Sequence, residues 1–383
     1  MTALRFLLDG RPLRGPSAVR GIGSYERGLL AGLSQIGAAR NTGLILAAQQ
    51  PLPEDAARFG IQIAAPRIAT FHPTLQPVLD PLLLSAALRR VRPALYHGVE
   101  WGQPLRTTVP VVVTVHDLIP FVFPSDYPWV RRSRVPALHL LRHAARVITP
   151  SEATARDVVR YAHVDSDRIA VVTEGIDPAF QPVADDRVTQ MRRELGIPRP
   201  YVLSVGTFDA RKRIDLLAEC FARIRSAHDV DLVIAGDQGT FAGRVTAALT
   251  NRNVAGNTHL VGRVGVETLV SLYSGAKLLL FASAYEGFGL PPLEAMACGT
   301  EVVMFANSSL TEVAGPAVVV RPDGDATALA RAACDVLATS PARKEERQKR
   351  TEWAARFTWP AAAARTVEVY ETAIAEQGKR RTP

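Results

Sequence analysis

Two glutamates eight positions apart, Glu286 and Glu294, lie in the segment EGFGLPPLEAMACG, which combines glycine, proline and carboxylate groups. Gly287 and Gly289 would let the backbone pass close to a ligand, and N–H groups at the start of the following helix would face an anion there. Ionised carboxylates accept hydrogen bonds from vicinal hydroxyls, which suits a ribose for Glu294 and a sugar ring for Glu286. The segment predicts a cradle for a phosphate or a sugar; a capped helix with an exposed glutamate is the alternative.

A second segment, VGTFDARKR, places Arg211 and Lys212 between the apolar run Tyr201–Val205 and a helix. Arginine and lysine can neutralise a diphosphate that gains negative charge as it leaves. The chain has 45 Lys and Arg residues but only five lysines, and Lys212 is the first of them. The alternative is the basic first turn of a solvated helix, although cations are disfavoured at helix N-termini unless an anion is present.

The first half of the chain offers a histidine at the end of its most apolar run. His116 follows Val109–Val115, so it should emerge at the carboxyl end of a strand, and Asp117 should orient it or hold the loop. A single histidine, taken alone, is more often structural. The segment RGIGSY is not a complete dinucleotide fingerprint, so Gly21 and Gly23 either contact a ligand or serve only the turn before the first helix.

The elements that must position these residues are short apolar runs, most of them continuously apolar, as in strands buried on both faces of a parallel sheet. Helical patterns lie between them, and Arg213–His228 has apolar residues at helical spacing. This alternation predicts an α/β protein with two tandem Rossmann-like, doubly wound domains. The expected strands are Leu4–Leu8, Gly43–Ala48, Ala94–Tyr96, Val109–Val115, Arg146–Thr149, Ile169–Thr173, Tyr201–Val205, Asp231–Ala235, His259–Val261, Lys277–Ala282, Glu301–Phe305 and Ala317–Val320.

The boundary between the domains is expected near residue 190, in a proline-bracketed stretch with a short polar helix. The first domain would then cover residues 1–190 and the second residues 191–358. Residues 359–383 would form a terminal helix that folds back across the first domain. Ligands of doubly wound sheets bind outside the carboxyl ends of the strands, so two such domains facing each other should enclose a cleft.

The segment EGFGLPPLEAMACGTEVV resembles the Glu-x7-Glu signature of the retaining glycosyltransferases of family 4, which have the GT-B fold of two Rossmann-like domains. Further similar blocks run in order along nearly the whole chain: GIGSYERGLLAGL, VVVTVHDLIPFVFP, VITPSEAT, VVTEGID, YVLSVGTFDARKR, LVIAG, HLVGRV and FTWPAAAARTVEVYETAI. The resemblance implies transfer of a sugar from a nucleotide-diphosphate donor with retention of anomeric configuration, without a metal or other cofactor.

The resemblance also implies roles for residues of this chain. It gives catalytic roles to His116, Glu286, Lys212 and Arg211, and an acceptor-side position to Gly21, Gly23 and Asp117. Many family members have an arginine directly after the loop glycine, where this chain has Thr207, so Arg211 is expected to supply that charge. The donor-binding residues implied are Gly206, Thr207, Arg211, Lys212, Val264, Glu286, Gly287, Phe288, Gly289, Leu290 and Glu294. The segment Ser308–Val313 resembles a family loop, but a plain surface loop is the favoured interpretation.

The charge and composition of the chain limit the classes of partner that it could bind. The net charge is +8, and residues 1–180 hold 20 Arg, no Lys and 14 acidic residues, hence +6. The basic residues are spread out without a nucleic-acid-reading motif, which argues against DNA or RNA as a partner. The segment Tyr127–Arg134 mixes aromatic and basic groups, so it is either a peripheral contact with an anionic membrane or an ordinary packed helix with a solvated basic edge.

Three cysteines, Cys220, Cys298 and Cys334, have no disulfide or metal-ligand spacing, and no apolar run reaches the roughly 20 residues needed to cross a bilayer. We expect a cytoplasmic protein, at most peripheral to the inner face of the membrane.

The expected activity is transfer of a hexose, with mannose favoured by the subgroup resemblance, to a glycan, lipid-linked or small-molecule acceptor in polysaccharide or glycoconjugate biosynthesis. Two alternatives stay open. One is a nucleotide-sugar-binding protein without turnover. The other is an epimerase or phosphorylase of the same fold. The scarcity of lysine argues against the cofactor-dependent phosphorylases.

Overall fold

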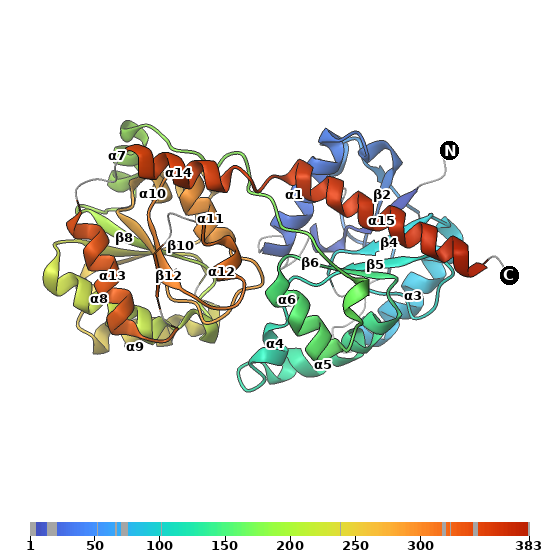
Figure 1. The fold of residues 1–383 in the computed structure, drawn as a ribbon, viewed down its shortest axis with the longest axis horizontal. Coiled ribbons are helices and arrows are strands. Elements are labelled where there is room, and N and C mark those ends of the chain that lie inside the picture. The colour runs from blue at the N-terminus through green and yellow to red at the C-terminus, as the bar shows by residue number, and fades with distance from the viewer. Residues whose placement is uncertain are drawn as a thin grey trace. The chain divides into compact units, whose positions relative to one another are not determined.

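The computed structural model describes residues 5–13, 21–51, 53–65, 67–69, 76–100, 102–237, 239–315, 319–321, 323–339 and 344–381. The chain divides into two compact units, Met1–Gly175 with Phe357–Pro383 and Ile176–Arg356. Each unit is a parallel sheet covered by helices on both faces, as the sequence predicts (Figure 1).

The first unit holds a seven-stranded sheet in the order β3-β2-β1-β4-β5-β6-β7. Consecutive residues of its strands face opposite sides. Val112 packs in the apolar cluster that contains α1 and α15 residues, whereas Val113 packs in the cluster with α3 and α5 residues, and both are fully buried. Burial on both faces is why the strand sequences are continuously apolar. The strands are β1 (Phe6–Asp9), β2 (Thr42–Ile45), β3 (Gln62–Ile63), β4 (Leu95–Gly98), β5 (Val111–Thr114), β6 (Arg146–Thr149) and β7 (Ile169–Val171).

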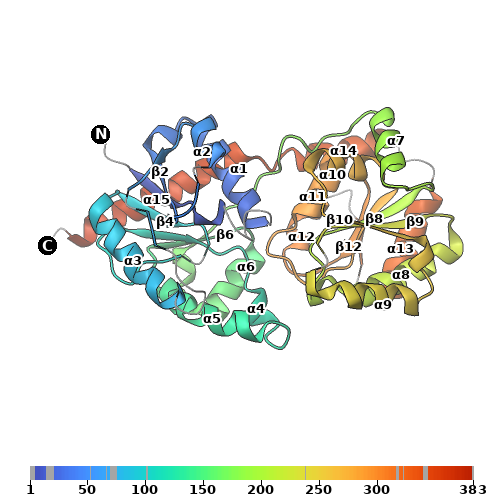
Figure 2. The same cartoon turned by 180° about the vertical axis from the view of Figure 1, so that it is seen from behind.

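The helices of the first unit are α1 (Gly21–Gln35), α2 (Glu54–Arg58), α3 (Gln76–Val91), α4 (Ile119–Val122), α5 (Pro128–Leu140), α6 (Glu152–Asp157) and α15 (Trp359–Arg381). Figures 1 and 2 show α15 beside α1 on one face of the sheet, with α3 and α5 on the other. The C-terminal helix therefore belongs to the first unit, in agreement with the prediction from sequence.

The second unit holds a six-stranded parallel sheet in the order β10-β9-β8-β11-β12-β13. Its strands are β8 (Tyr201–Val205), β9 (Asp231–Ala235), β10 (Thr258–Gly262), β11 (Leu278–Phe281), β12 (Val302–Phe305) and β13 (Val319–Arg321). Its helices are α7 (Asp185–Glu194), α8 (Ile214–Ala227), α9 (Ala242–Asn251), α10 (Val266–Gly275), α11 (Leu290–Ala297), α12 (Leu310–Val313), α13 (Ala326–Ala338) and α14 (Lys344–Ala354).

Two differences from the sequence-based expectations have local causes. The strand β3 was not predicted, because its two residues are too short a run to give an apolar signal. The transition between the units lies at Gly175–Ile176, earlier than the expected position near residue 190, because α7 packs on α10 and so belongs to the second unit. Of the expected strands at Leu4–Leu8 and Ala317–Val320, residues 4, 317 and 318 lie outside the described residues.

Candidate active-site residues

The loops after β8 and β11 meet at the carboxyl edge of the second sheet. These strands are neighbours, with Leu278 opposite Val202 and Leu279 opposite Leu203, and the strand order reverses between them. In doubly wound sheets this switch point is where ligands bind. The backbone N–H of Ala284 donates to the Arg211 carbonyl at 2.8 Å, which joins the two loops directly.

Glu286 lies between the two cations of the β8 loop. Its Oε1 atom is 2.6 Å from Lys212 Nζ and its Oε2 atom is 2.6 Å from Arg211 Nη1, while Ser283 Oγ donates to Oε1 at 2.7 Å. Burial alone would raise the pKa of Glu286, but the charges of Arg211 and Lys212 outweigh it and lower that pKa to about 2. The structure thus brings together three of the predicted catalytic residues as an ion cluster in which Lys212 is buried and Arg211 and Glu286 are half-buried, with a serine that the sequence analysis did not single out.

Lys212 owes its position to a glycine and an aromatic ring. It ends the 3-10 turn Ala210–Lys212, its side chain is 6% exposed, and its Nζ lies 4.4 Å from the centroid of Phe281. A Cβ on Gly206 would come within 2.8 Å of Lys212 Nζ, and the φ of Gly206 is +146°, so only glycine fits there. Burial lowers the pKa of Lys212, opposed by the charge of Glu286. Gly206 therefore makes room for the ammonium group.

The backbone of Glu286 is held by a neighbouring loop. Its N–H donates to Ser308 Oγ at 3.0 Å, and Ser309 Oγ donates to its carbonyl at 2.9 Å. Ser309 and Val313 are fully buried. The favoured interpretation of residues 308–313 as a plain surface loop is therefore wrong, since these serines fix a predicted site residue. A pair of serines gives no distinctive sequence signal, which is why the contact was missed.

The segment 287–290 leads into α11, which starts at Leu290. Gly289 has a φ of +121°, and a Cβ there would lie 3.0 Å from Val313 and 3.1 Å from Leu310, whereas Phe288 is buried. The residues after Leu290 in the first turn are Pro291 and Pro292, which have no N–H. Of the first three residues of α11, only Leu290 therefore has a backbone N–H that could face an anion, as was expected of the helix start.

Glu294 lies further along α11 with a different partner. Tyr273 Oη, on α10, donates to Glu294 Oε2 at 2.9 Å. Burial raises the pKa of Glu294 to about 7; the hydrogen bond from Tyr273 opposes this shift, and the Asp177 charge adds to it. The contact with Tyr273 was not predicted, because the two residues belong to different helices. Two further predicted donor residues, Thr207 and Val264, are half-buried in the loops after β8 and β10.

In the first unit, His116 stands just past β5, as predicted, with a partner at each ring nitrogen. Its Nε2 lies 2.9 Å from the Val99 carbonyl, which can only accept, and its Nδ1 lies 3.3 Å from Glu174 Oε1. Burial lowers the pKa of His116, but the hydrogen bond and charge of Glu174 outweigh it, so the pKa is raised. Tyr25 packs edge-on, with ring centroids 4.5 Å apart. Tyr25 and Glu174 were not singled out from the sequence.

The other acceptor-side predictions fall in the same unit. Asp117 Oδ1 accepts the N–H of Ile119 at 3.1 Å and so holds the start of α4, and the charge of Asp117 also contributes to the raised pKa of His116. Gly21 and Gly23 lie inside the first turn of α1 and not in a turn before it. A Cβ on Gly21 would meet open space.

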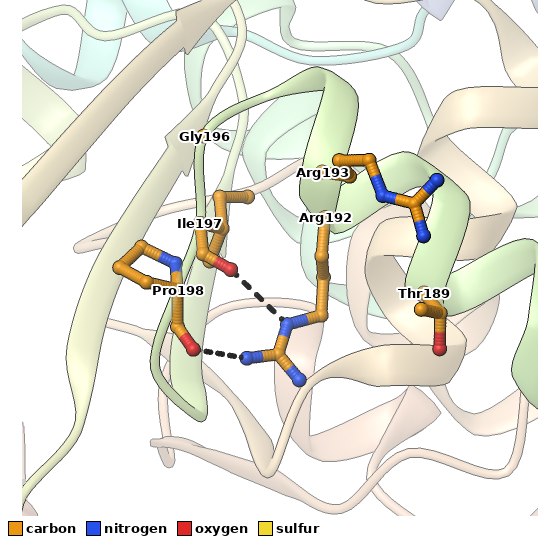
Figure 3. A pocket seen from close by; sticks show the side chains of 6 residues that line it. All are labelled: Thr189, Arg192, Arg193, Gly196, Ile197 and Pro198. Atoms are coloured by element: carbon orange, nitrogen blue, oxygen red, sulfur yellow. Dashed lines mark hydrogen bonds between the residues drawn. The ribbon is translucent and has the colours of Figure 1, made fainter.

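One surface hollow of the second unit, of about 360 Å³, is lined by residues outside the predicted site: Thr189, Arg192, Arg193, Gly196, Ile197 and Pro198 (Figure 3). There Arg192 donates to the carbonyls of Ile197 at 3.2 Å and Pro198 at 2.8 Å, which closes the turn after α7. The arginine is thus used structurally.

No group of three or more His, Cys, Asp or Glu side chains is placed to hold a metal ion among the described residues. No described helix combines the length and apolarity needed to cross a membrane.

Comparison with known proteins gives consistent matches to both halves of the chain. The family model "Glycosyl transferases group 1" matches residues 188–355, and the model "Glycosyltransferase Family 4" matches residues 36–180. The O-antigen chain mannosyltransferase B of Escherichia coli is 28% identical over 300 residues, covering 77% of this chain and 78% of that protein. The D-inositol 3-phosphate glycosyltransferase of Salinispora arenicola is 31% identical over 301 residues, covering 73% and 67%.

A solved structure shares the fold. Anabaena Alr3699/HepE in complex with UDP and glucose superposes with a TM-score of 0.74 and 16% identity, covering 96% of this chain and 99% of that one.

Proposed function

This chain belongs to the family 4, group 1 type of glycosyltransferases, and from that premise we propose that it transfers a hexose from a nucleotide-diphosphate sugar with retention of anomeric configuration and without a metal. The observation that carries the proposal is the ion cluster of Arg211, Lys212 and Glu286 at the switch point of the second sheet. Two cations with little exposure to water can stabilise the charge that a departing diphosphate acquires.

Five of the predicted residues have a role in this proposal. Arg211 and Lys212 neutralise the leaving nucleoside diphosphate, and Glu286 with the loop after it positions the donor sugar. Glu294 accepts hydrogen bonds from the ribose. The catalytic role proposed for His116 rests on its position just past β5; each of its ring nitrogens has a hydrogen-bond partner. The leaving phosphate itself takes the proton of the acceptor hydroxyl, so no pair of carboxylates at glycosidase spacing is required.

We favour a mannosyl donor and a glycan acceptor. The name of the Escherichia coli relative, an O-antigen chain mannosyltransferase, supports this substrate class, and the HepE structure with UDP supports a nucleotide-linked donor. A thermal-shift panel of UDP-, GDP-, ADP- and dTDP-sugars tests the base, because a ligand that binds only the folded state raises stability according to its affinity. The donor should give the largest increase in melting temperature among the sugars of the panel, and the absence of any increase would contradict donor binding.

Substitution of Lys212 tests the role of the cations. Lys212→Ala should lower turnover on the order of 100-fold or more, as expected when a group that stabilises developing charge is lost. Lys277→Ala is the matched control, since Lys277 is exposed just before β11. Turnover is measured with the donor identified in the panel, with and without EDTA. Near-normal turnover of Lys212→Ala would remove the role of this lysine, and loss of wild-type activity in EDTA would remove metal independence.

A peripheral membrane contact is supported by the N-terminal turn of α5. Trp129 is 78% exposed and Val130 is 44% exposed, beside the exposed Arg131 and Arg132. An exposed tryptophan next to arginines suits the interface of an anionic bilayer. We expect the wild type to sediment with liposomes of phosphatidylglycerol and phosphatidylcholine, and the variant Trp129→Ala/Arg131→Glu/Arg132→Glu to stay in solution. Equal sedimentation of both would exclude this surface.

A further inference from the structure

Glu286 forms ion pairs with the two cations that a diphosphate would need. Lys212 Nζ and Arg211 Nη1 each lie 2.6 Å from one of its carboxylate oxygens, so both carboxylate oxygens are used. The three side chains are between 6% and 13% exposed. In such a position a cation without a partner would be costly, so the carboxylate acts as an internal counter-ion.

The charges of this cluster cancel. Arg211 and Lys212 carry two positive charges; Glu286 carries one negative charge, and Asp209, whose Oδ2 lies 3.4 Å from Arg211 Nε, carries another. While Glu286 is paired with Arg211 and Lys212, the net charge of the cluster is zero and does not attract a pyrophosphate group. The two cations become available to pyrophosphate only when the carboxylate of Glu286 moves away from them.

We propose that Glu286 exchanges partners during the reaction: the diphosphate of the donor displaces its carboxylate from Arg211 and Lys212, and the hydroxyls of the donor sugar become its new partners. This inference rests on the proposed function and adds a competition between enzyme carboxylate and leaving group for the same two cations.

The surroundings of Glu286 permit this exchange. Its backbone is held on both sides, by Ser308 at the N–H and by Ser309 at the carbonyl, so the residue stays in the loop while its side chain changes partners. The cations keep their own positions: Arg211 Nη1 also donates to the Tyr285 carbonyl at 3.2 Å, and Lys212 is confined by Phe281 and Gly206. The carboxylate is therefore the element that moves.

The exchange has a consequence for product release. While the intact donor is bound, the sugar hydroxyls compensate Glu286 for its lost cations. Once the sugar has passed to the acceptor, that compensation ends, and the carboxylate competes again with the nucleoside diphosphate. The enzyme should therefore hold its donor more firmly, relative to its product, than an enzyme without this carboxylate.

Calorimetric titration with inorganic pyrophosphate, UDP and GDP tests the competition. Glu286→Gln keeps the shape of the side chain and removes the competing charge, so it should bind pyrophosphate about tenfold or more tightly than the wild type, the equivalent of ~1.4 kcal/mol. The same variant should show a lower product-inhibition constant for the nucleoside diphosphate. Glu294→Gln, in the same segment but bonded to Tyr273, is the matched control and should leave pyrophosphate affinity unchanged.

A second variant covers the case in which Glu286→Gln does not fold. Ser283→Ala removes one donor to Glu286 Oε1 and leaves the charges in place, so it weakens the hold on the carboxylate and should tighten pyrophosphate binding several-fold. Unchanged or weaker binding in the folded variants would overturn the exchange. If the wild type still transfers sugar in that case, the proposed function stands alone. If no form binds pyrophosphate and no sugar is transferred, both proposals fail.

Discussion

At the scale of single residues, the two glutamates of the segment EGFGLPPLE are driven in opposite directions by their surroundings. Glu286 meets two cations and has a pKa of about 2, whereas Glu294 is buried beside Tyr273 and has a pKa of about 7. Both are glutamates of one short segment, and the sequence does not show that their pKa values differ. The partners on neighbouring elements make Glu286 a permanent anion and Glu294 a group that titrates near neutral pH.

The pKa of Glu294 predicts how nucleotide binding depends on pH. If only the ionised carboxylate accepts the ribose hydroxyls, a pKa of about 7 makes the ionised fraction rise about tenfold between pH 6 and 8. The affinity for the nucleoside diphosphate should rise with it in calorimetric titrations. Glu294→Gln, titrated with the same ligand, should lose this part of the pH dependence, because the titration of the ligand is common to both. An identical profile for both proteins would contradict the ribose contact.

The same pKa predicts a change of stability with pH. The carboxyl titrates near 4.5 when unfolded and near 7 when folded, so its protonated form favours folding. This contribution is complete below pH 4.5 and is lost as the pH rises through 7. The melting temperature of Glu294→Gln should therefore rise relative to that of the wild type between pH 5 and 8. A constant difference in melting temperature across that range would refute the raised pKa.

Gly206 offers a residue-scale test of how Lys212 is placed. Gly206→Ala puts a Cβ 2.8 Å from Lys212 Nζ at a φ of +146°, so the ammonium group must shift. We expect lower turnover together with a loss of stability of about 1–3 kcal/mol, as overpacking costs elsewhere. Gly243→Ala in α9, where a Cβ meets open space, is the control and should not lose stability. Full activity of Gly206→Ala would show that the position of Lys212 is not critical.

At the scale of elements, the close approach of α1 and α15 depends on glycines. A Cβ on Gly28 would lie 1.9 Å from the ring of Trp359, and one on Gly32 would lie 2.3 Å from the Trp359 carbonyl oxygen. A Cβ on Gly175 would lie 2.3 Å from the backbone nitrogen of Trp359. These three glycines form the socket that receives the start of α15. The aromatic residue next to a helix start was visible in the sequence, but its socket comes from two distant segments.

Filling this socket should separate α15 from α1. Gly32→Ala brings a methyl group against backbone atoms that cannot rotate away, so we expect a loss of stability of about 1–3 kcal/mol. Gly21→Ala, in the same helix with open space at its Cβ, is the matched control and should cause no loss. Chemical denaturation monitored by tryptophan fluorescence measures both. Equal stability of Gly32→Ala and Gly21→Ala would mean that the helices can slide apart at no cost.

At the scale of the whole molecule, the chain leaves the first unit after Gly175 and returns to it at Phe357. The returning helix supplies buried residues to the first core, among them Ala363, Tyr370 and Ala373. The first unit is therefore incomplete without α15, whereas the second unit is one continuous segment. Their stabilities should respond differently to loss of the C-terminus.

Truncation after Arg356 tests this dependence. Without α15 the core between α1 and the first sheet is open to water, so hydrogen exchange should increase in α1 and β1. The strands β8 and β11 should keep their protection, and pyrophosphate should still slow exchange in the loop around Lys212. Uniform loss of protection in both units would show that they fold as one cooperative body.

The sequence by itself determined the local and repetitive features of this protein. The run Val109–Val115 was predicted as a strand of a parallel sheet because it is continuously apolar, and Val111–Thr114 forms β5 of such a sheet, with both faces buried. The order of the Glu-x7-Glu segment, the basic loop and the strand-end histidine likewise indicated the family. The two-residue β3 was beyond reach, since so short a strand has no pattern.

Only the tertiary structure decided which side chains meet. Lys212 and Glu286 are 74 positions apart and touch because β8 and β11 are neighbours in the sheet. Ser309 behind Glu286, Tyr273 beside Glu294 and the glycine socket of Trp359 follow from the same packing of distant segments. Charge, hydrogen bonding and close approach act through space over a few ångströms. A pattern along the chain can therefore indicate which residues reach a sheet edge, while strand order determines their partners and, with them, their ionisation.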